Sequence, residues 1–131
     1  RVNSPAGAMA FARYFFAQAN LAYTTPRSGL LPPLSTAKCK TCAAFEATAS
    51  RYVREGLRYD RNPVQILEVT LDAEPLTSGH IVDLVAHQQP ARVIDGAGAV
   101  VENIKEQKVI FVINVVSVDA AWRIDSVKVM Q

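Results

Sequence analysis

The spacing of apolar residues along this chain changes near Pro63 from a helical period to a strand period. Upstream of Pro63, apolar residues recur every three or four positions, which places them on one face of a helix. Downstream, they alternate with polar residues, the pattern of a strand with one buried face. Helices that precede an antiparallel sheet are typical of an α+β domain, and 131 residues suffice for one such domain with its own core.

The segment 3–25 has the features of an amphipathic helix. Ser4 suits the N-cap because its side chain can accept a hydrogen bond from a free backbone N–H, and Pro5 suits the first helical position. The apolar positions predict a helix of about five turns. Its buried face would consist of Ala8, Phe11, Ala12, Phe15, Ala19 and Ala22, widened by Phe16 and Tyr23. The Pro- and Gly-rich segment 26–33 then predicts an ordered surface loop.

A second helix is expected after Cys42, ending near Gly56, which suits a helix C-terminus. Its predicted buried stripe is Ala43, Phe45, Ala49, Tyr52 and Val53. We interpret the charged segment 51–61 as the solvated end of this helix.

The remainder of the chain predicts strands over 64–74, 80–88, 91–96, 108–118 and 121–130, with the last two forming a hairpin. In the first strand, Leu67, Val69, Leu71 and Ala73 would face the core, and the polar segment 102–107 is interpreted as a solvated turn. The strand 108–118 is apolar on both sides, so both sides require cover. We therefore expect two to three N-terminal helices packed on one face of a curved, mostly antiparallel β-sheet, in a single domain over 1–131.

Composition and motifs exclude several classes of function. The net charge is +2 with both signs scattered, and no basic stripe with interleaved aromatics predicts a nucleic-acid partner. The longest apolar stretch, 109–116, is too short to span a bilayer and is interrupted by Asn114. No glycine-rich phosphate loop or paired-carboxylate pattern is present, so no cofactor is expected.

The order of the elements, with "WRIDSVKV" after the last turn, resembles the cone-shaped (cystatin-like) fold of the nuclear transport factor 2 superfamily. Relatives in that superfamily include ketosteroid isomerase and the SnoaL-like polyketide cyclases. Cone-fold relatives commonly pair through the sheet face away from the helices, so the resemblance, together with the two-sided apolar strand, implies a homodimer through this face.

Three stretches, "SPAGAMAFARYFF", "PLSTAKCKTC" and "RVIDGAGAVVE", resemble an uncharacterised family of actinobacterial secreted lipoproteins. The resemblance implies an extracytoplasmic domain anchored to the cell membrane by a lipid-bearing Cys upstream of Arg1. Because the chain begins at Arg1 rather than Met, we expect the native signal, anchor and linker to be absent.

Cys39 and Cys42 are the only cysteines, three positions apart ahead of the second helix. A redox-active dithiol has this spacing at a helix start, but it needs a preceding strand in a βαβ unit. A zinc site needs four ligands, and His80 and His87 would point to opposite faces of a strand, so no metal site is expected. We favour a structural disulfide, which needs only an oxidising compartment. Redox activity and free thiols stay as alternatives.

Candidate site residues are few. Catalysis of the ketosteroid isomerase type needs a general base and an acidic donor inside the cone. Tyr14, Asp83 and His87 are the candidates for these roles, although each is also interpretable as a surface residue. Tyr14 and Asn114 are candidates for ligand binding, since a buried Asn needs hydrogen-bond partners.

The sequence thus favours a non-catalytic extracytoplasmic binding domain for an apolar small molecule or a cell-envelope protein. The alternative is a small isomerase, cyclase or dehydratase that uses the cone pocket. An enzyme needs two titratable groups that converge inside the pocket. The strands supply mostly Val, Ile and Leu there.

Overall fold

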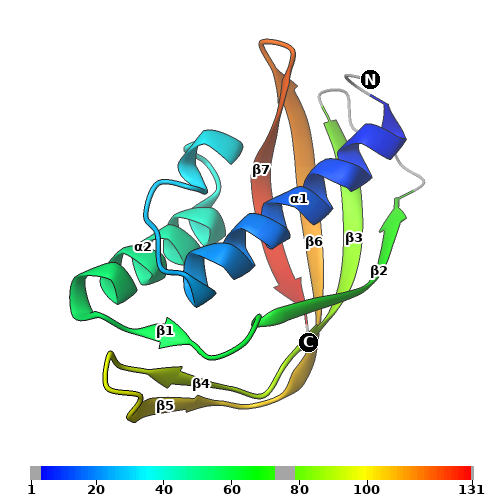
Figure 1. Ribbon diagram of the computed structural model, residues 1–131. Helices are drawn as coiled ribbons and strands as arrows, with labels where there is room; N and C mark the ends of the chain where they lie inside the picture. The colour runs from blue at the N-terminus through cyan, green and yellow to red at the C-terminus, as the bar shows by residue number, and fades with distance from the viewer. Residues whose placement is uncertain (1–3, 73–78, 131) are drawn as a thin grey trace.

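The computed structural model describes residues 4–72 and 79–130 (Figure 1). The helical elements are α1 (Pro5–Thr24), the short 3-10 helix η1 (Pro32–Leu34) and α2 (Lys40–Glu55). The strands are β1 (Arg58–Tyr59), β2 (Val64–Leu71), β3 (Gly79–Gln88), β4 (Ala91–Ile94), β5 (Val100–Ile104), β6 (Gln107–Val118) and β7 (Ala121–Met130).

The helix α1 begins and packs as its sequence predicts. Ser4 is the N-cap, and its hydroxyl accepts a hydrogen bond of 2.9 Å from the backbone N–H of Gly7. Pro5 occupies the first helical position, where its missing N–H costs nothing. The buried residues are Ala8, Ala12, Phe15, Phe16, Ala19 and Ala22, and Phe11 lies partly buried at the edge of this face.

The helix α2 ends at Gly56, which has a φ of 69° and takes the left-handed conformation that glycine adopts without strain. Its buried face differs from the prediction. Cys42, Ala49 and Tyr52 are buried, whereas Ala43 and Val53 are exposed. The stripe therefore follows the spacing from Cys42 through Phe45 to Ala49 and Tyr52, and the positions one residue beyond it turn toward solvent.

The strands form two antiparallel sheets. A four-stranded sheet has the order β2-β3-β6-β7, and a three-stranded sheet has the order β1-β4-β5. Figure 1 shows both helices on one side of the four-stranded sheet, with β1, β4 and β5 lying beyond its lower end near α2. This is the expected α+β, cone-like arrangement. None of the helices in the described part of the chain has the length and hydrophobicity that a bilayer crossing requires.

The four-stranded sheet has a front face, toward the helices, and a back face. On β3, Val82, Leu84 and Ala86 are buried on the front, while Asp83 and Val85 alternate with them on the back. On β6, Val109, Phe111, Ile113 and Val115 are buried on the front. The front residues form the main core with α1, Leu31 and the two cysteines.

Three details of the strand prediction are wrong. A β-bulge between Ile66 and Glu68 shifts the register, so Leu67 is 53% exposed and Ile66 instead packs on the core. The segment 102–107 is largely strand rather than turn, because β5 pairs with β4. The charged segment 51–61 is the exposed end of α2 as far as Glu55, but beyond it the segment contains β1, which pairs Tyr59 with Val93. Ala73, also expected to face the core, lies outside the described residues.

Candidate functional site

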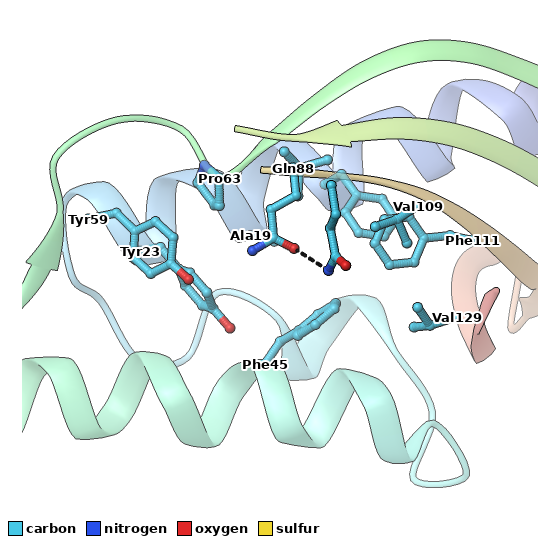
Figure 2. A pocket seen from close by; sticks show the side chains of 12 residues that line it. Ala19, Tyr23, Phe45, Tyr59, Pro63, Gln88, Val109, Phe111 and Val129 are labelled. Carbon is cyan, nitrogen blue, oxygen red and sulfur yellow. Dashed lines mark hydrogen bonds between the residues drawn. The ribbon is translucent and has the colours of Figure 1, made fainter. Parts of the chain in front are cut away.

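A cavity of about 250 Å³ lies between the two helices and the lower end of the front face (Figure 2). Both helices, several strands and the loop before β2 contribute residues to its wall. The lining residues are Phe16, Ala19, Tyr23, Phe45, Tyr59, Pro63, Val64, Gln88, Gln107, Val109, Phe111 and Val129. The cavity is therefore built mainly from aromatic and aliphatic side chains, as is typical of small-molecule pockets.

Aromatic rings dominate the cavity wall. Phe16 of α1 lies with its ring centroid 4.7 Å from that of Phe111 on β6 and 6.3 Å from that of Phe45 on α2. Tyr23 and Tyr59 have ring centroids 5.1 Å apart. Figure 2 shows these two tyrosines at one end of the cavity and Phe111 at the other. Such pairs fix one another in place, so the walls are preformed.

The polar part of the cavity is an amide pair. Gln88 on β3 and Gln107 on β6 are direct cross-strand partners, and Gln107 Nε2 donates to Gln88 Oε1 at 3.2 Å (Figure 2). Each lies two residues from a buried front-face residue of its strand, Ala86 or Val109, and therefore points to the same side of the sheet. The two glutamines thus extend the front face beyond these residues. Along each strand, every second residue is apolar until Gln88 or Gln107 takes the next position of the series. This change from apolar to polar could have identified the two glutamines from the sequence, and our interpretation missed it.

Asn20 joins α1 to the sheet edge beside the cavity. Its Nδ2 donates to the carbonyl of Val64 at 3.0 Å, and its Oδ1 accepts from the N–H of Val64 at 3.0 Å. A single side chain thereby satisfies both backbone groups of the first residue of β2, as a neighbouring strand would. The contact fixes Val64 in the cavity wall.

The tyrosines at one end of the cavity stay protonated well above neutral pH. Burial raises the pKa of Tyr23 to about 12, and the hydrogen bond with Thr48 opposes this shift only in part. Burial, followed by the neighbouring Tyr52 and Tyr23, also raises the pKa of Tyr59. Among the described residues that line the cavity, these are the only titratable side chains. The site can donate hydrogen bonds, but none of these lining groups changes charge near neutral pH.

The residues singled out in the sequence lie elsewhere. Tyr14 is half exposed on the outer side of α1. Asp83 and His87 do share one side of β3, as predicted, but that side is the back face. Asn114 lies on the same back face beside Gly79, and its buried Oδ1 has no hydrogen-bond partner in the described part of the chain.

The structure does not bring Asp83 and His87 together as a catalytic pair. Asp83 lies next to Asp72, and burial followed by this neighbouring carboxyl raises its pKa. His87 Nε2 instead contacts Glu106, and its Nδ1 lies 3.4 Å from Gln65 Oε1. In residues 4–72 and 79–130, His, Cys, Asp and Glu side chains form no cluster of three or more suited to a metal ion.

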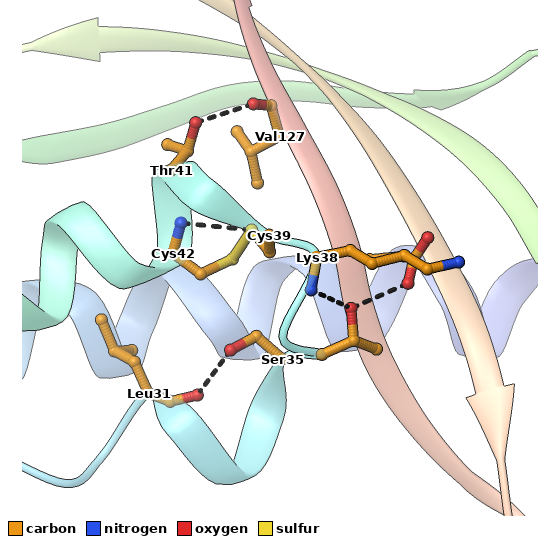
Figure 3. Close-up of a disulfide and its surroundings, with 9 residues drawn as sticks. Leu31, Ser35, Lys38, Cys39, Thr41, Cys42 and Val127 are labelled. Carbon is orange, nitrogen blue, oxygen red and sulfur yellow. Dashed lines mark hydrogen bonds between the residues drawn. A yellow bond between two sulfur atoms is a disulfide. The ribbon is translucent and has the colours of Figure 1, made fainter.

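The two cysteines form the expected disulfide (Figure 3). Cys39 is the N-cap of α2, and its Sγ accepts a hydrogen bond of 3.1 Å from the N–H of Cys42. Each cysteine is only 2% exposed and belongs to the main core. Next to it, the Thr41 hydroxyl donates to the carbonyl of Val127 on β7. The disulfide therefore closes the first turn of α2, and the Thr41 contact joins this turn to the sheet.

A second hollow of about 280 Å³ adjoins the disulfide and is lined by residues of η1, the following loop and α2. Glu46 is its only acidic lining residue among those described. Glu46 Oε2 accepts a hydrogen bond from the N–H of Gly29, and its buried Oε1 has no partner among the described atoms. The carboxylate closes the loop onto α2, which is a structural role.

Two solved structures share this fold over nearly the whole chain. The intermembrane space region of the chloroplast protein ARC6 superimposes with a TM-score of 0.72 at 16% identity, covering 97% of this chain and 96% of that one. Aln2 from a Streptomyces species superimposes with a TM-score of 0.61 at 18% identity, covering 100% of this chain and 94% of that one. At these identities the likeness shows the fold alone.

No curated protein matches the chain. The profile of a family of unknown function, DUF6318, matches residues 1–128. The match extends from the first residue through almost all of β7 and thus includes every element around the cavity. The chain belongs to this family, DUF6318.

Proposed function

We propose that this domain is a non-catalytic extracytoplasmic binding module that holds a small apolar molecule in the cavity between α1, α2 and the sheet. The observation that carries the proposal is the chemistry of the cavity wall. Aromatic and aliphatic side chains supply most of its surface, and the polar groups come from the Gln88–Gln107 amide pair and the hydroxyls of Tyr23 and Tyr59. An apolar ring system would bury its surface against Phe16, Phe45 and Phe111, and the amide pair would orient a single polar substituent.

The size of the cavity bounds the ligand. A cavity of about 150 Å³ holds benzene, whereas pockets for drug-sized molecules begin at about 300 Å³. The cavity volume of about 250 Å³ lies between these values. We therefore expect a ligand of about two fused or linked rings.

The same wall argues against the enzymatic alternative. Isomerase or cyclase chemistry needs a base and an acid that converge on the substrate. The lining tyrosines hold their protons well above neutral pH, and glutamine does not titrate. Asp83 and His87, the residues proposed from the sequence, lie on the opposite face of the sheet.

The disulfide supports an extracytoplasmic location. Disulfides of this kind form and persist in oxidising compartments and are rare where thiols are kept reduced. Burial of both sulfurs in the core suits a structural bond rather than an exchanging one. The resemblance to secreted actinobacterial lipoproteins supports the finer proposal that a lipid on a preceding segment anchors the domain to the cell membrane.

The test uses 1-aminonaphthalene, a two-ring aromatic probe with one polar group, whose fluorescence changes when it enters apolar surroundings. The wild-type chain should bind it saturably with one site per chain. Ala19→Trp fills the cavity from α1 and should weaken binding at least tenfold. Ala10→Trp makes the same change on the exposed side of the same helix and should bind like the wild type. Thermal unfolding would verify that both variants fold.

A second, smaller substitution at the same position tests the proposal if tryptophan distorts the core. Ala19→Leu should weaken binding by an intermediate factor, in proportion to the volume it fills. Equal binding by Ala19→Trp, Ala19→Leu and the wild type, or no saturable binding by the wild type, would overturn the proposal.

A further inference from the structure

The wall of the cavity between the helices and the sheet carries no formal charge. Among the described residues that line it, none is Asp, Glu, Lys, Arg or His. Its polar groups are the amides of Gln88 and Gln107 and the hydroxyls of Tyr23 and Tyr59. A charged group of a ligand would therefore meet no counter-ion on this wall, and burial of a charge without a partner is costly.

The charged side chains next to the two glutamines lie outside the cavity. His87 and Lys108, which adjoin Gln88 and Gln107 in sequence, are cross-strand partners on the back face of the sheet. Glu106 contacts His87 Nε2 at 2.5 Å and so also lies away from the front face. The amides are thus the groups that this end of the sheet offers to a ligand.

Beyond the tyrosines, the charged side chains pair with one another. Arg92 Nε lies 2.9 Å from Asp60 Oδ2, and Arg51 Nη1 lies 3.5 Å from Glu55 Oε1. None of these four residues lines the cavity. They therefore leave its wall neutral at this end as well.

The two lining tyrosines report how the cavity treats a negative charge. Burial is the main reason that the pKa of Tyr23 rises to about 12, so the surroundings disfavour a phenolate. Burial is also the largest cause of the raised pKa of Tyr59, and the neighbouring tyrosines and the carboxylate of Glu102 act in the same direction. An anionic ligand would meet the same opposition.

Gln88 supplies a hydrogen-bond donor inside the cavity. Its Oε1 accepts from Gln107 Nε2 at 3.2 Å, and its own Nε2 has no hydrogen-bond partner in the described part of the chain. Figure 2 shows the nitrogen of this amide on the side toward the two tyrosines. An amide nitrogen donates hydrogen bonds and accepts none, so its partner on a ligand must be an acceptor.

We propose that the ligand of this cavity is an uncharged two-ring compound whose polar substituent is a carbonyl group, and that the carbonyl oxygen accepts a hydrogen bond from Gln88 Nε2. This inference rests on the proposed function, since it specifies the ligand of the same cavity. A carboxylate would also accept this bond, but it would bring a charge without a counter-ion. An ammonium group would bring a charge and would place donor against donor. A neutral carbonyl meets both conditions.

The test compares four compounds that share a naphthalene ring, each measured by displacement of 1-aminonaphthalene. They are 2-acetylnaphthalene, its isostere 2-isopropenylnaphthalene with CH₂ in place of the oxygen, the anion 2-naphthoate and the cation formed by 2-(aminomethyl)naphthalene. At pH 7 the wild-type chain should bind 2-acetylnaphthalene at least about thirtyfold more tightly than either ion. Gln88→Met removes the donor at nearly unchanged side-chain length. It should weaken binding of 2-acetylnaphthalene about tenfold and that of 2-isopropenylnaphthalene by no more than about twofold.

Gln89→Met is the matched control, because it makes the same change one residue further along, outside the cavity lining. It should bind both neutral compounds like the wild type. Equal affinity for neutral and charged compounds, or equal loss of both neutral compounds in Gln88→Met, would overturn this inference. Saturable binding of 1-aminonaphthalene would in that case still support the proposed function. A wild-type chain that binds none of these compounds saturably would overturn both.

Discussion

The two faces of the four-stranded sheet come from alternate residues of the same strands, yet their environments differ completely. On the front, Val82 and Leu84 are fully buried beneath α1. On the back, Asp83 and Val85 alternate with them in sequence and stay partly exposed. The front is apolar where the helices cover it, and the Gln88–Gln107 pair adds amide groups to the cavity there. The back combines apolar residues of β6 with charged residues on the neighbouring strands, and many of its side chains stay partly exposed.

The largest expected difference between the two faces is the stability lost when a buried side chain on the front is truncated. Phe15 is fully buried between α1 and the sheet, so Phe15→Ala should lower the free energy of unfolding by about 3–5 kcal/mol, because it opens a cavity. Ile110→Ala on the back face, where Ile110 is 38% exposed, should cost only about 1 kcal/mol. Denaturant unfolding of both variants measures the difference. Similar losses for the two variants would show that the faces do not differ in this way.

A smaller effect is expected from the polar contact that joins α1 to the sheet edge. Asn20→Ala leaves the N–H and carbonyl of Val64 without their partner, and should cost about 1–3 kcal/mol. It should also weaken binding of 1-aminonaphthalene, because Val64 lines the cavity.

Thr70→Val is the matched control for this contact, since Thr70 lies on the back of the same strand. This change should alter stability by no more than about 0.5 kcal/mol. If Asn20→Ala were as mild as the control, the contact of Asn20 with Val64 would not position β2.

The sequence predicts those elements whose signal is local. Ser4, Pro5 and Gly56 mark helix ends through their own backbone and side-chain chemistry, and all three lie where expected. The bulge at Leu67 was not predictable from alternation, because an extra residue in a strand leaves the local pattern almost unchanged. The short strand β1 exists only because Tyr59 pairs with Val93, more than thirty residues away.

The candidate site was harder to predict than the fold for the same reason. Parity placed Asp83 and His87 on one side of β3 but did not say which side the helices would cover. The neighbouring residues indicate which side is covered. Val82, Leu84 and Ala86, on the opposite side of the strand, are all apolar, and they face the core. The cavity itself gathers residues from both helices, several strands and the loop before β2, and this convergence is a property of the tertiary structure alone.

The most direct test of the account is a methyl NMR titration of the valine-labelled chain with naphthalene. If naphthalene enters the cavity, the methyl resonances of Val64, Val109 and Val129, which line it, should shift saturably. Those of Val85, Val112 and Val118, on the back of the same sheet, should stay in place. Shifts confined to the back-face valines, or none at all up to the solubility limit of naphthalene, would contradict a binding cavity beneath the helices.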